Sequence, residues 1–121
     1  MTPEELLDLQ VKEFNKGNIN FLMTLYENDA CFAYEPGHVI KGLENIRHTF
    51  QSFIDMGGTL EAKPKRVLRA GDLALLITEW SIIGNEPNGK PINLTGRGTV
   101  VLRQQSDNSW LMVIESPMGT D

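Results

Sequence analysis

The residues best suited to acid–base chemistry lie around one predicted turn, Glu35-Pro36-Gly37, with Tyr34 just before it and His38 just after it. Inside an apolar pocket, the Glu35 carboxyl would lose hydration and act as a general base that removes a proton next to a carbonyl. Tyr34 or His38 would then donate a hydrogen bond to the developing oxyanion. The same pattern also fits a turn carboxylate in water, a half-buried strand tyrosine and a surface histidine.

A second candidate base is Glu115, near the end of the chain. Centring the last hairpin on Asp107 and Asn108 places Glu115 opposite Val100, on the sheet face that also carries Trp80. A carboxylate inside the fold is costly and is more typical of a functional site than of a structural one. A register slip of one residue would instead put Glu115 outside.

The preceding hairpin supplies candidate ligand-binding residues. Its symmetric register pairs Glu79 with Arg97, so Arg97 would either bind a ligand carboxylate through parallel hydrogen bonds or form a cross-strand ion pair. Trp80 points to the other face, where Gly96 and Gly98 carry no side chains. These glycines either leave space for a ligand beside Trp80 or mark a sharp bend in the sheet.

Three segments that would position these residues show helical periodicity. The first begins at Thr2 with a capping-box pattern, carries an apolar stripe and ends at Gly17. A second, shorter helix opens at Asn18, and Tyr26 falls on its apolar face. The third covers residues 43–56 and ends at a pair of glycines.

The remaining apolar runs favour strands. Pro64 interrupts one of them, which makes that strand an edge strand or places a bulge in it. The order of elements predicts an α+β fold in which a curved antiparallel or mixed sheet of about four long strands wraps on three helices. The predicted strands cover residues 30–34, 38–40, 60–70, 73–83, 92–103 and 110–115.

Both faces of the central strands are apolar. Leu75 and Ile77 belong to one face, and Leu76 and Trp80 belong to the other. A sheet that covers helices with one face commonly shows water a polar second face. We therefore expect the second face to meet a partner, most simply a second copy of the chain in a homodimer.

Length and composition narrow the function classes. The 121 residues are sized for one domain, which we take as residues 1–121. The net charge is −5 and no dense basic cluster occurs, so we expect no nucleic-acid or membrane partner. The sequence contains one cysteine and two histidines, which are few ligands for a metal site, so we expect no metal. It contains no phosphate-binding or nucleophile motif, so we expect no cofactor. Without a recognisable signal peptide or membrane-spanning stretch, we expect a cytoplasmic protein.

Five short strings carry a family resemblance. They are Asn15-Lys16-Gly17-Asn18, Leu25-Tyr26-Glu27-Asn28-Asp29-Ala30, the stretch from Lys41 to Phe50, Gly71-Asp72-Leu73-Ala74-Leu75, and the stretch from Asp107 to Ile114. In this order they resemble the NTF2-like superfamily, which includes SnoaL-like polyketide cyclases and ketosteroid isomerases. The resemblance implies a cone-shaped α+β fold that encloses an apolar pocket, and dimerisation through the outer sheet face.

The resemblance to ketosteroid isomerases does not extend to their catalytic residues. Tyr34 stands at the position of the family's general-base aspartate, and Gln10 stands at that of its oxyanion tyrosine. No carboxylate occurs between Leu94 and Leu102, where the family's oxyanion acid would lie. We therefore expect chemistry other than steroid isomerisation.

The sequence thus predicts a SnoaL-like protein that binds a small hydrophobic molecule in a pocket lined by the helices, Trp80 and Met112. As an enzyme it would transfer protons without a cofactor, in a reaction of the isomerase, cyclase or dehydratase type. Glu35 or Glu115 would be the base, with Tyr34 among the donors. The alternative is a non-catalytic ligand-binding or dimerisation module with the same fold. Two polar groups converging inside the pocket would favour the enzyme.

Overall fold

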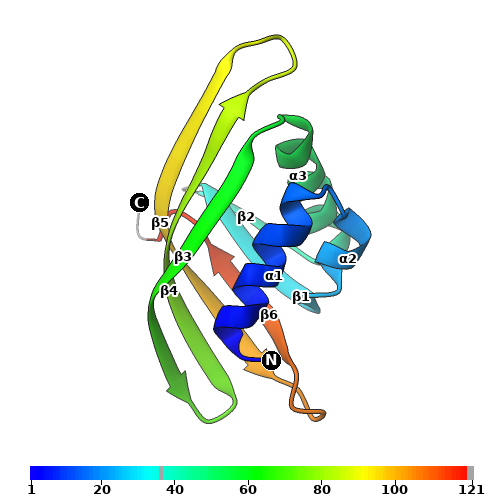
Figure 1. Ribbon diagram of the computed structural model, residues 1–121. Coiled ribbons are helices and arrows are strands. Elements are labelled where there is room, and N and C mark those ends of the chain that lie inside the picture. Colours follow the sequence, from blue (N-terminus) through cyan, green and yellow to red (C-terminus); the bar gives the residue numbers. More distant parts are fainter. Residues whose placement is uncertain (36, 120–121) are drawn as a thin grey trace.

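The computed structural model describes residues 1–35 and 37–119, in which three helices lie on one face of a curved, six-stranded sheet (Figure 1). The helices are α1 (Pro3–Asn15), α2 (Ile19–Met23) and α3 (Leu43–Asp55). The strands are β1 (Tyr26–Glu35), β2 (His38–Lys41), β3 (Thr59–Ala70), β4 (Leu73–Asn85), β5 (Pro91–Gln104) and β6 (Trp110–Ser116). Pro36, in the middle of the predicted turn, lies outside the described residues.

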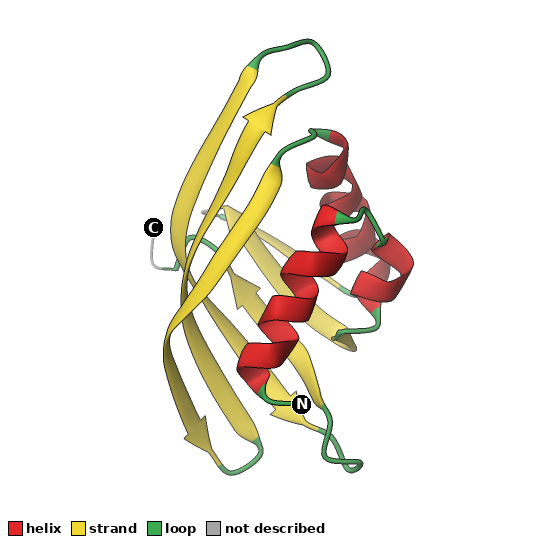
Figure 2. Cartoon of the chain, in the orientation of Figure 1, coloured by secondary structure: helices red, strands yellow, loops and turns green. Residues whose placement is uncertain are grey.

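The sheet confirms the predicted α+β class but is wider than about four strands. Its strand order is β2-β1-β6-β5-β4-β3. All neighbouring strands are antiparallel except β1 and β6, which run parallel. The two N-terminal strands, β1 and β2, join the sheet because β1 pairs with β6, the last strand of the predicted antiparallel meander. The curved strands bend around the helices (Figure 2).

The start of α1 matches the predicted capping box. The Thr2 backbone N–H donates to Glu5 Oε1 at 2.8 Å, and the Glu5 backbone N–H donates to Thr2 Oγ1 at 3.2 Å. These bonds satisfy two N–H groups that have no partner within the helix. With its start fixed, α1 buries Leu7, Gln10 and Phe14 on one face.

The second helix is shorter than its apolar spacing predicts. It ends at Met23, and the Leu25 carbonyl accepts a hydrogen bond from the Met112 backbone N–H at 2.8 Å. Tyr26 is therefore not on a helix: it begins β1, opposite Met112 on β6. Pairing with a strand distant in sequence overrides the local helical pattern.

The predicted pairings of Glu79 and Glu115 in the two C-terminal hairpins are confirmed, although the last hairpin shifts register by one residue between Val101 and Leu102. Glu79 lies opposite Arg97, and Glu115 lies opposite Val100. Both alternatives for Pro64 hold, because β3 is an edge strand and its pairing with β4 shifts just after this residue. Glu115 therefore faces the helices rather than the outside of the sheet.

Aromatic rings fill much of the space between α3 and the sheet. The rings of Phe32 and Phe50 are stacked with centroids 5.0 Å apart. Phe53 meets Phe50 edge-to-face at 6.5 Å, and Phe14 does so at 6.2 Å. Such large rings prefer particular packing angles, and their packing leaves gaps between them. Phe14, Phe32, Phe50 and Phe53 therefore form part of the wall of a chamber between the helices and the sheet.

Candidate functional site

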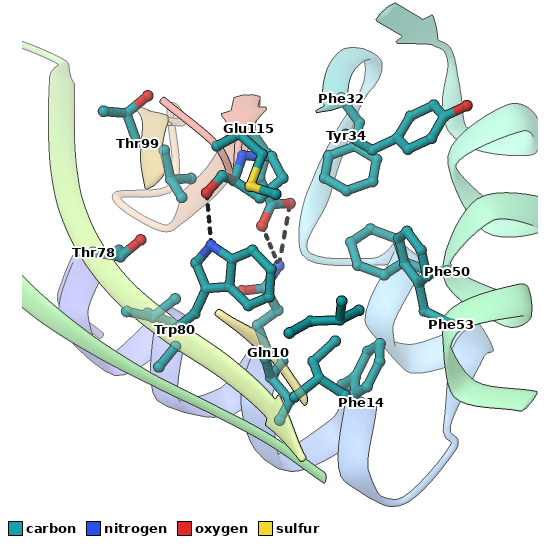
Figure 3. Close-up of a pocket in the computed structure, with 18 of the residues that line it drawn as sticks. Gln10, Phe14, Phe32, Tyr34, Phe50, Phe53, Thr78, Trp80, Thr99 and Glu115 are labelled. Atoms are coloured by element: carbon teal, nitrogen blue, oxygen red, sulfur yellow. Dashed lines mark hydrogen bonds between the residues drawn. The ribbon is translucent and has the colours of Figure 1, made fainter. Parts of the chain in front are cut away.

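A chamber of about 280 Å³ lies between the helices and the concave face of the sheet (Figure 3). Its volume is at the small end of the range for ligand pockets. Most of its wall is apolar, and both layers of the fold contribute to it. Its aromatic lining residues are Phe14, Phe32, Tyr34, Phe50, Phe53 and Trp80.

Regular periodicity brings these side chains together. Thr78 and Trp80 are two residues apart on β4, so both point to the concave face. Leu7, Gln10 and Phe14 follow helical spacing on α1 and form the facing wall. The chamber thus depends on the sheet alternation and the helix stripe that the sequence predicts.

Glu115 lines the chamber and belongs to a hydrogen-bonded network of three polar side chains. The Tyr26 hydroxyl donates a hydrogen bond to Glu115 Oε1 at 2.5 Å. The Gln10 amide nitrogen donates to the Tyr26 hydroxyl at 2.6 Å and to Glu115 Oε2 at 3.1 Å. Gln10 and Tyr26 are 3% and 4% exposed, whereas Glu115 is half-buried and lines the chamber. Residues from α1, β1 and β6 therefore fix one carboxyl group in place.

This environment changes the acidity of both ionisable members of the network. Burial raises the pKa of Glu115 above its ordinary value, and the hydrogen bonds from Tyr26 and Gln10 only partly oppose that rise. Burial, together with the neighbouring Glu115 charge, raises the pKa of Tyr26 well above its ordinary value. A carboxyl group with a raised pKa can hold and release a proton nearer neutral pH than a carboxyl in water.

The predicted Tyr34, Glu35 and His38 cluster lies at the edge of the chamber. His38 Nδ1 is 3.1 Å from Glu35 Oε1, and half or more of each of these two side chains is exposed. Tyr34 and Glu35 line the chamber, whereas His38 is not among the lining residues. The Tyr34 hydroxyl points away from Glu115 in Figure 3. These three residues therefore contact one another, but mostly on the solvent side.

Trp80 forms a wall of the chamber, but the glycines beside it leave no free space. A Cβ atom on Gly96 would lie 2.6 Å from the Trp80 ring, and one on Gly98 would lie 2.8 Å from the Pro117 backbone. The protein itself fills the volume that these glycines open. The Trp80 indole N–H donates to the Pro117 carbonyl at 2.6 Å, which fastens the segment after β6 over the chamber.

The other predicted ligand-binding residues lie away from the chamber. Arg97 and Glu79 are on the convex face, where Arg97 Nε is 3.9 Å from Glu79 Oε1 and 86% of the Arg97 side chain is exposed. Lys65 Nζ is 3.8 Å from Glu79 Oε2 on the same face. Met112 points toward the concave side but is fully buried in the core, so it does not line the chamber as predicted.

Gln10 and Tyr26 are the site residues that sequence reasoning missed. The sequence marks Gln10 only as the residue at the family's tyrosine position, and its apolar spacing predicts a helix at Tyr26. One signal was available: Gln10 interrupts the stripe of Leu7 and Phe14 on the buried face of α1. A polar residue there needs a buried partner. No local pattern could identify that partner as Tyr26 or Glu115.

Among the described residues, no group of three histidine, cysteine, aspartate or glutamate side chains could hold a metal ion. Within the same part of the chain, no helix is both long enough and apolar enough to cross a membrane. The polar groups of the chamber itself come from Gln10, Thr78, Thr99 and the carboxyls, with tyrosine at the edge.

Comparison with known families finds one matching family model, the SnoaL-like domain, over residues 9–110. Comparison with curated proteins finds no match. The family match covers the chamber residues from Gln10 on α1 through β1, α3, β4 and β5, and it ends before Glu115 is reached on β6.

Solved structures share the fold at low sequence identity. A ketosteroid isomerase-like protein from Erwinia carotovora atroseptica has a TM-score of 0.83 and 16% identity, over 98% of this chain and 93% of that one. An NTF2-like superfamily protein from Salmonella enterica has a TM-score of 0.79 and 16% identity, over 98% and 90%. A proposed calcium/calmodulin-dependent protein kinase II association domain from Xanthomonas campestris has a TM-score of 0.75 and 21% identity, over 96% and 85%. These likenesses establish an NTF2-like fold.

Proposed function

The chain belongs to the SnoaL-like domain family, and we propose that it binds a small hydrophobic ligand in the chamber and exchanges a proton with that ligand through Glu115. The observation that carries this proposal is that Glu115, one of the two carboxyls lining an apolar chamber, is held in place by Tyr26 and Gln10. Proton transfer requires such a group to be both fixed in position and accessible to the ligand.

Glu115 is suited to act as a base when ionised and as an acid when protonated. Burial raises its pKa, so its protonated form persists to a higher pH than that of a carboxyl in water, and its half-buried side chain lines the chamber. Tyr26 does not line the chamber, and we assign it to positioning Glu115. Gln10 also holds Glu115, and it lines the chamber itself. Apolar walls would exclude water and strengthen the polar contacts made at Glu115.

The remaining polar groups of the chamber have supporting roles in this proposal. Thr78 places a hydroxyl on the wall beside Trp80, where it can bind a second polar atom of the ligand. Glu35, at the edge, contacts His38 and solvent, so we propose it for ligand entry rather than as the base. The expected reaction needs no cofactor and is of the isomerase, cyclase or dehydratase type.

The proposal is tested with a panel of lipophilic ketones. Compounds that raise the melting temperature are incubated in deuterium oxide, and exchange next to the carbonyl is followed by NMR. We expect Glu115→Gln to abolish the exchange while still binding the ketone, because the amide keeps the shape and loses the base. The matched control Glu35→Gln should retain exchange. Undiminished exchange in Glu115→Gln would show that the base is elsewhere.

A non-catalytic association module is the second candidate, and the convex face of the sheet favours it. Leu68 and Ile114 are each 44% exposed there, and Leu75, Ile77 and Val101 on the same face are half-buried. Contiguous apolar surface of this kind is typical of interfaces. We propose that two copies of the chain pack through this face as a homodimer.

Sedimentation equilibrium tests the homodimer. We expect the wild-type chain to sediment as a dimer and Ile114→Lys to sediment as a monomer, because a lysine in the interface would bury an unpaired charge. Val39→Lys is the matched control, since Val39 is also exposed but lies on β2 at the far edge of the sheet. A monomeric wild-type chain would exclude this assembly.

A further inference from the structure

We propose that the ligand of the chamber is an organic cation, a protonated or quaternary amine carried on a small apolar body. This inference rests on the proposed function, since it concerns the same chamber. It adds the charge of the ligand, which the family and the fold leave open.

The charged residues that line the chamber, among those described, are all acidic. Glu35 and Glu115 both line it, and none of its lining residues within the described chain is a lysine, an arginine or a histidine. His38 approaches Glu35 only from the solvent side. An anionic ligand would therefore meet like charge without a counter-charge, which costs binding energy. A cation would meet two groups of opposite charge.

Glu115 in particular has room for a cationic partner. Its contacts in the structure are the Tyr26 hydroxyl and the Gln10 amide, which are neutral donors. Oε2 accepts only the 3.1 Å bond from Gln10 among the described residues, although a carboxylate has about four acceptor sites. Both donors favour the ionised form, but neither supplies the positive charge that a buried carboxylate requires. An ammonium group in the chamber would supply it.

The aromatic walls suit both parts of such a ligand. Six aromatic side chains line the chamber, and their ring faces attract a nearby cation while their area covers an apolar body. Trp80 is the strongest site of this kind, because indole has the most favourable face for a cation. A neutral ligand would use the same apolar area, but it would leave Glu115 without a counter-charge.

Three compounds of matched shape separate these cases: 3-phenylpropylamine, 3-phenylpropan-1-ol and 3-phenylpropanoate. Their dissociation constants are measured by titration calorimetry. We expect the amine to bind at least about tenfold more tightly than the alcohol, and the carboxylate to bind most weakly. The quaternary trimethylammonium analogue should retain much of the advantage, since it carries the charge without an N–H donor.

Glu115→Gln identifies the group responsible. The variant should bind the alcohol as the wild-type chain does and lose the preference for the amine, whereas Glu35→Gln should keep most of that preference. Should Glu115→Gln fail to fold, pH provides the same test in the wild-type chain. The titratable groups that face Glu115 or the chamber are Tyr26, Tyr34 and Glu35, with His38 beyond Glu35. The preference for the amine should fall as Glu115 becomes protonated at lower pH, with proton release on binding near that transition.

The outcomes distinguish this inference from the proposed function. The decisive measurement is made on the wild-type chain at a pH where Glu115 is ionised. If the amine and the alcohol bind equally well there, the inference of a cationic ligand is wrong, whereas the proposed proton exchange with ketones is unaffected. A preference for the amine that survives in Glu115→Gln also overturns it. If none of the compounds binds and no ketone exchanges a proton, both the inference and the proposed function are wrong.

Discussion

The Tyr26 hydroxyl donates a 2.5 Å hydrogen bond to the Glu115 carboxylate, although the two residues are 89 positions apart. Parallel pairing of β1 with β6 brings them together, because it sets Tyr26 opposite Met112, three residues before Glu115. Tyr26 itself does not line the chamber. The acidity of Glu115 therefore depends on a residue that does not line the chamber.

Replacing Tyr26 with phenylalanine should raise the pKa of Glu115 further. The hydrogen bond from Tyr26 stabilises the ionised carboxylate, and Gln10 would become the remaining donor. Removing the hydroxyl should also lower the free energy of unfolding by about 1–2 kcal/mol. Carbon-13 NMR titration of the glutamate carboxyls measures the first effect, and urea unfolding measures the second. Tyr34→Phe is the control and should leave the Glu115 titration in place; an unchanged titration in Tyr26→Phe would contradict the network.

Stability should depend on pH through Glu115. Because the folded-state pKa of Glu115 is raised above the ordinary value of 4.5, the folded chain binds more protons than the unfolded chain between these two values. The free energy of unfolding should therefore fall as pH rises through that window, by at most about 1.4 kcal/mol per pH unit. Glu115→Gln cannot ionise, and its stability should lack this component.

Urea unfolding at a series of pH values compares the two proteins. The difference in free energy of unfolding, wild type minus Glu115→Gln, should decline with pH above 4.5 and level off above the folded-state pKa. Glu35→Gln, which removes an exposed acid, serves as the charge-matched control and should follow the wild-type profile. Parallel profiles for wild type and Glu115→Gln would mean that Glu115 is not desolvated.

The observed partner of Glu115 in the sheet matches the prediction, but a bulge in the hairpin contributes to that match. Counting outward from Asp107 and Asn108 places Glu115 opposite Val100, as observed. The pairs nearest the turn are offset from this count by one residue, and a bulge between Val101 and Leu102 restores the counted register. The same counting places Glu79 opposite Arg97. Register and facing follow from the two-residue period of a strand, which the sequence displays directly.

The partners of Glu115 could not be predicted in the same way. Tyr26 continues the helical spacing of Ile19 and Leu22, and only contact with a strand distant in sequence makes it a strand residue. Parallel pairing has no turn from which a register can be counted. Similarly, the residues after β6 fill the space over Gly98, for which the sequence left both an open space and a bend in the sheet as alternatives.

Substituting alanine for Gly98 should detach the segment after β6 from the chamber. The new Cβ would lie 2.8 Å from the Pro117 backbone, so this segment must shift and its bond to Trp80 must lengthen or break. Overpacking of this kind costs about 1–3 kcal/mol of stability. In a Trp110→Phe background, the emission of Trp80 should move to longer wavelength as its indole N–H becomes hydrated.

Thr95→Ala is the matched control for this effect, because Thr95 is exposed on the same strand as Gly98 and opposite Ser81 rather than Trp80. It should leave both the emission and the unfolding midpoint close to those of the parent. If Gly98→Ala left the Trp80 emission unchanged, the hydrogen bond to Pro117 would not determine the position of this segment.

Tyr26 should resist ionisation until the fold is lost. Burial and the adjacent Glu115 hold the pKa of Tyr26 well above 10, so the unfolded chain ionises this phenol first and stability falls as pH rises beyond that value. In a Tyr34→Phe background, Tyr26 is the tyrosine that remains, and the rise in phenolate absorbance should coincide with the loss of far-ultraviolet circular dichroism. Phenolate absorbance that rises near pH 10 while the Tyr34→Phe chain stays folded would show that water reaches Tyr26, and Glu115 would then lack the dry, fixed setting on which its proposed chemistry depends.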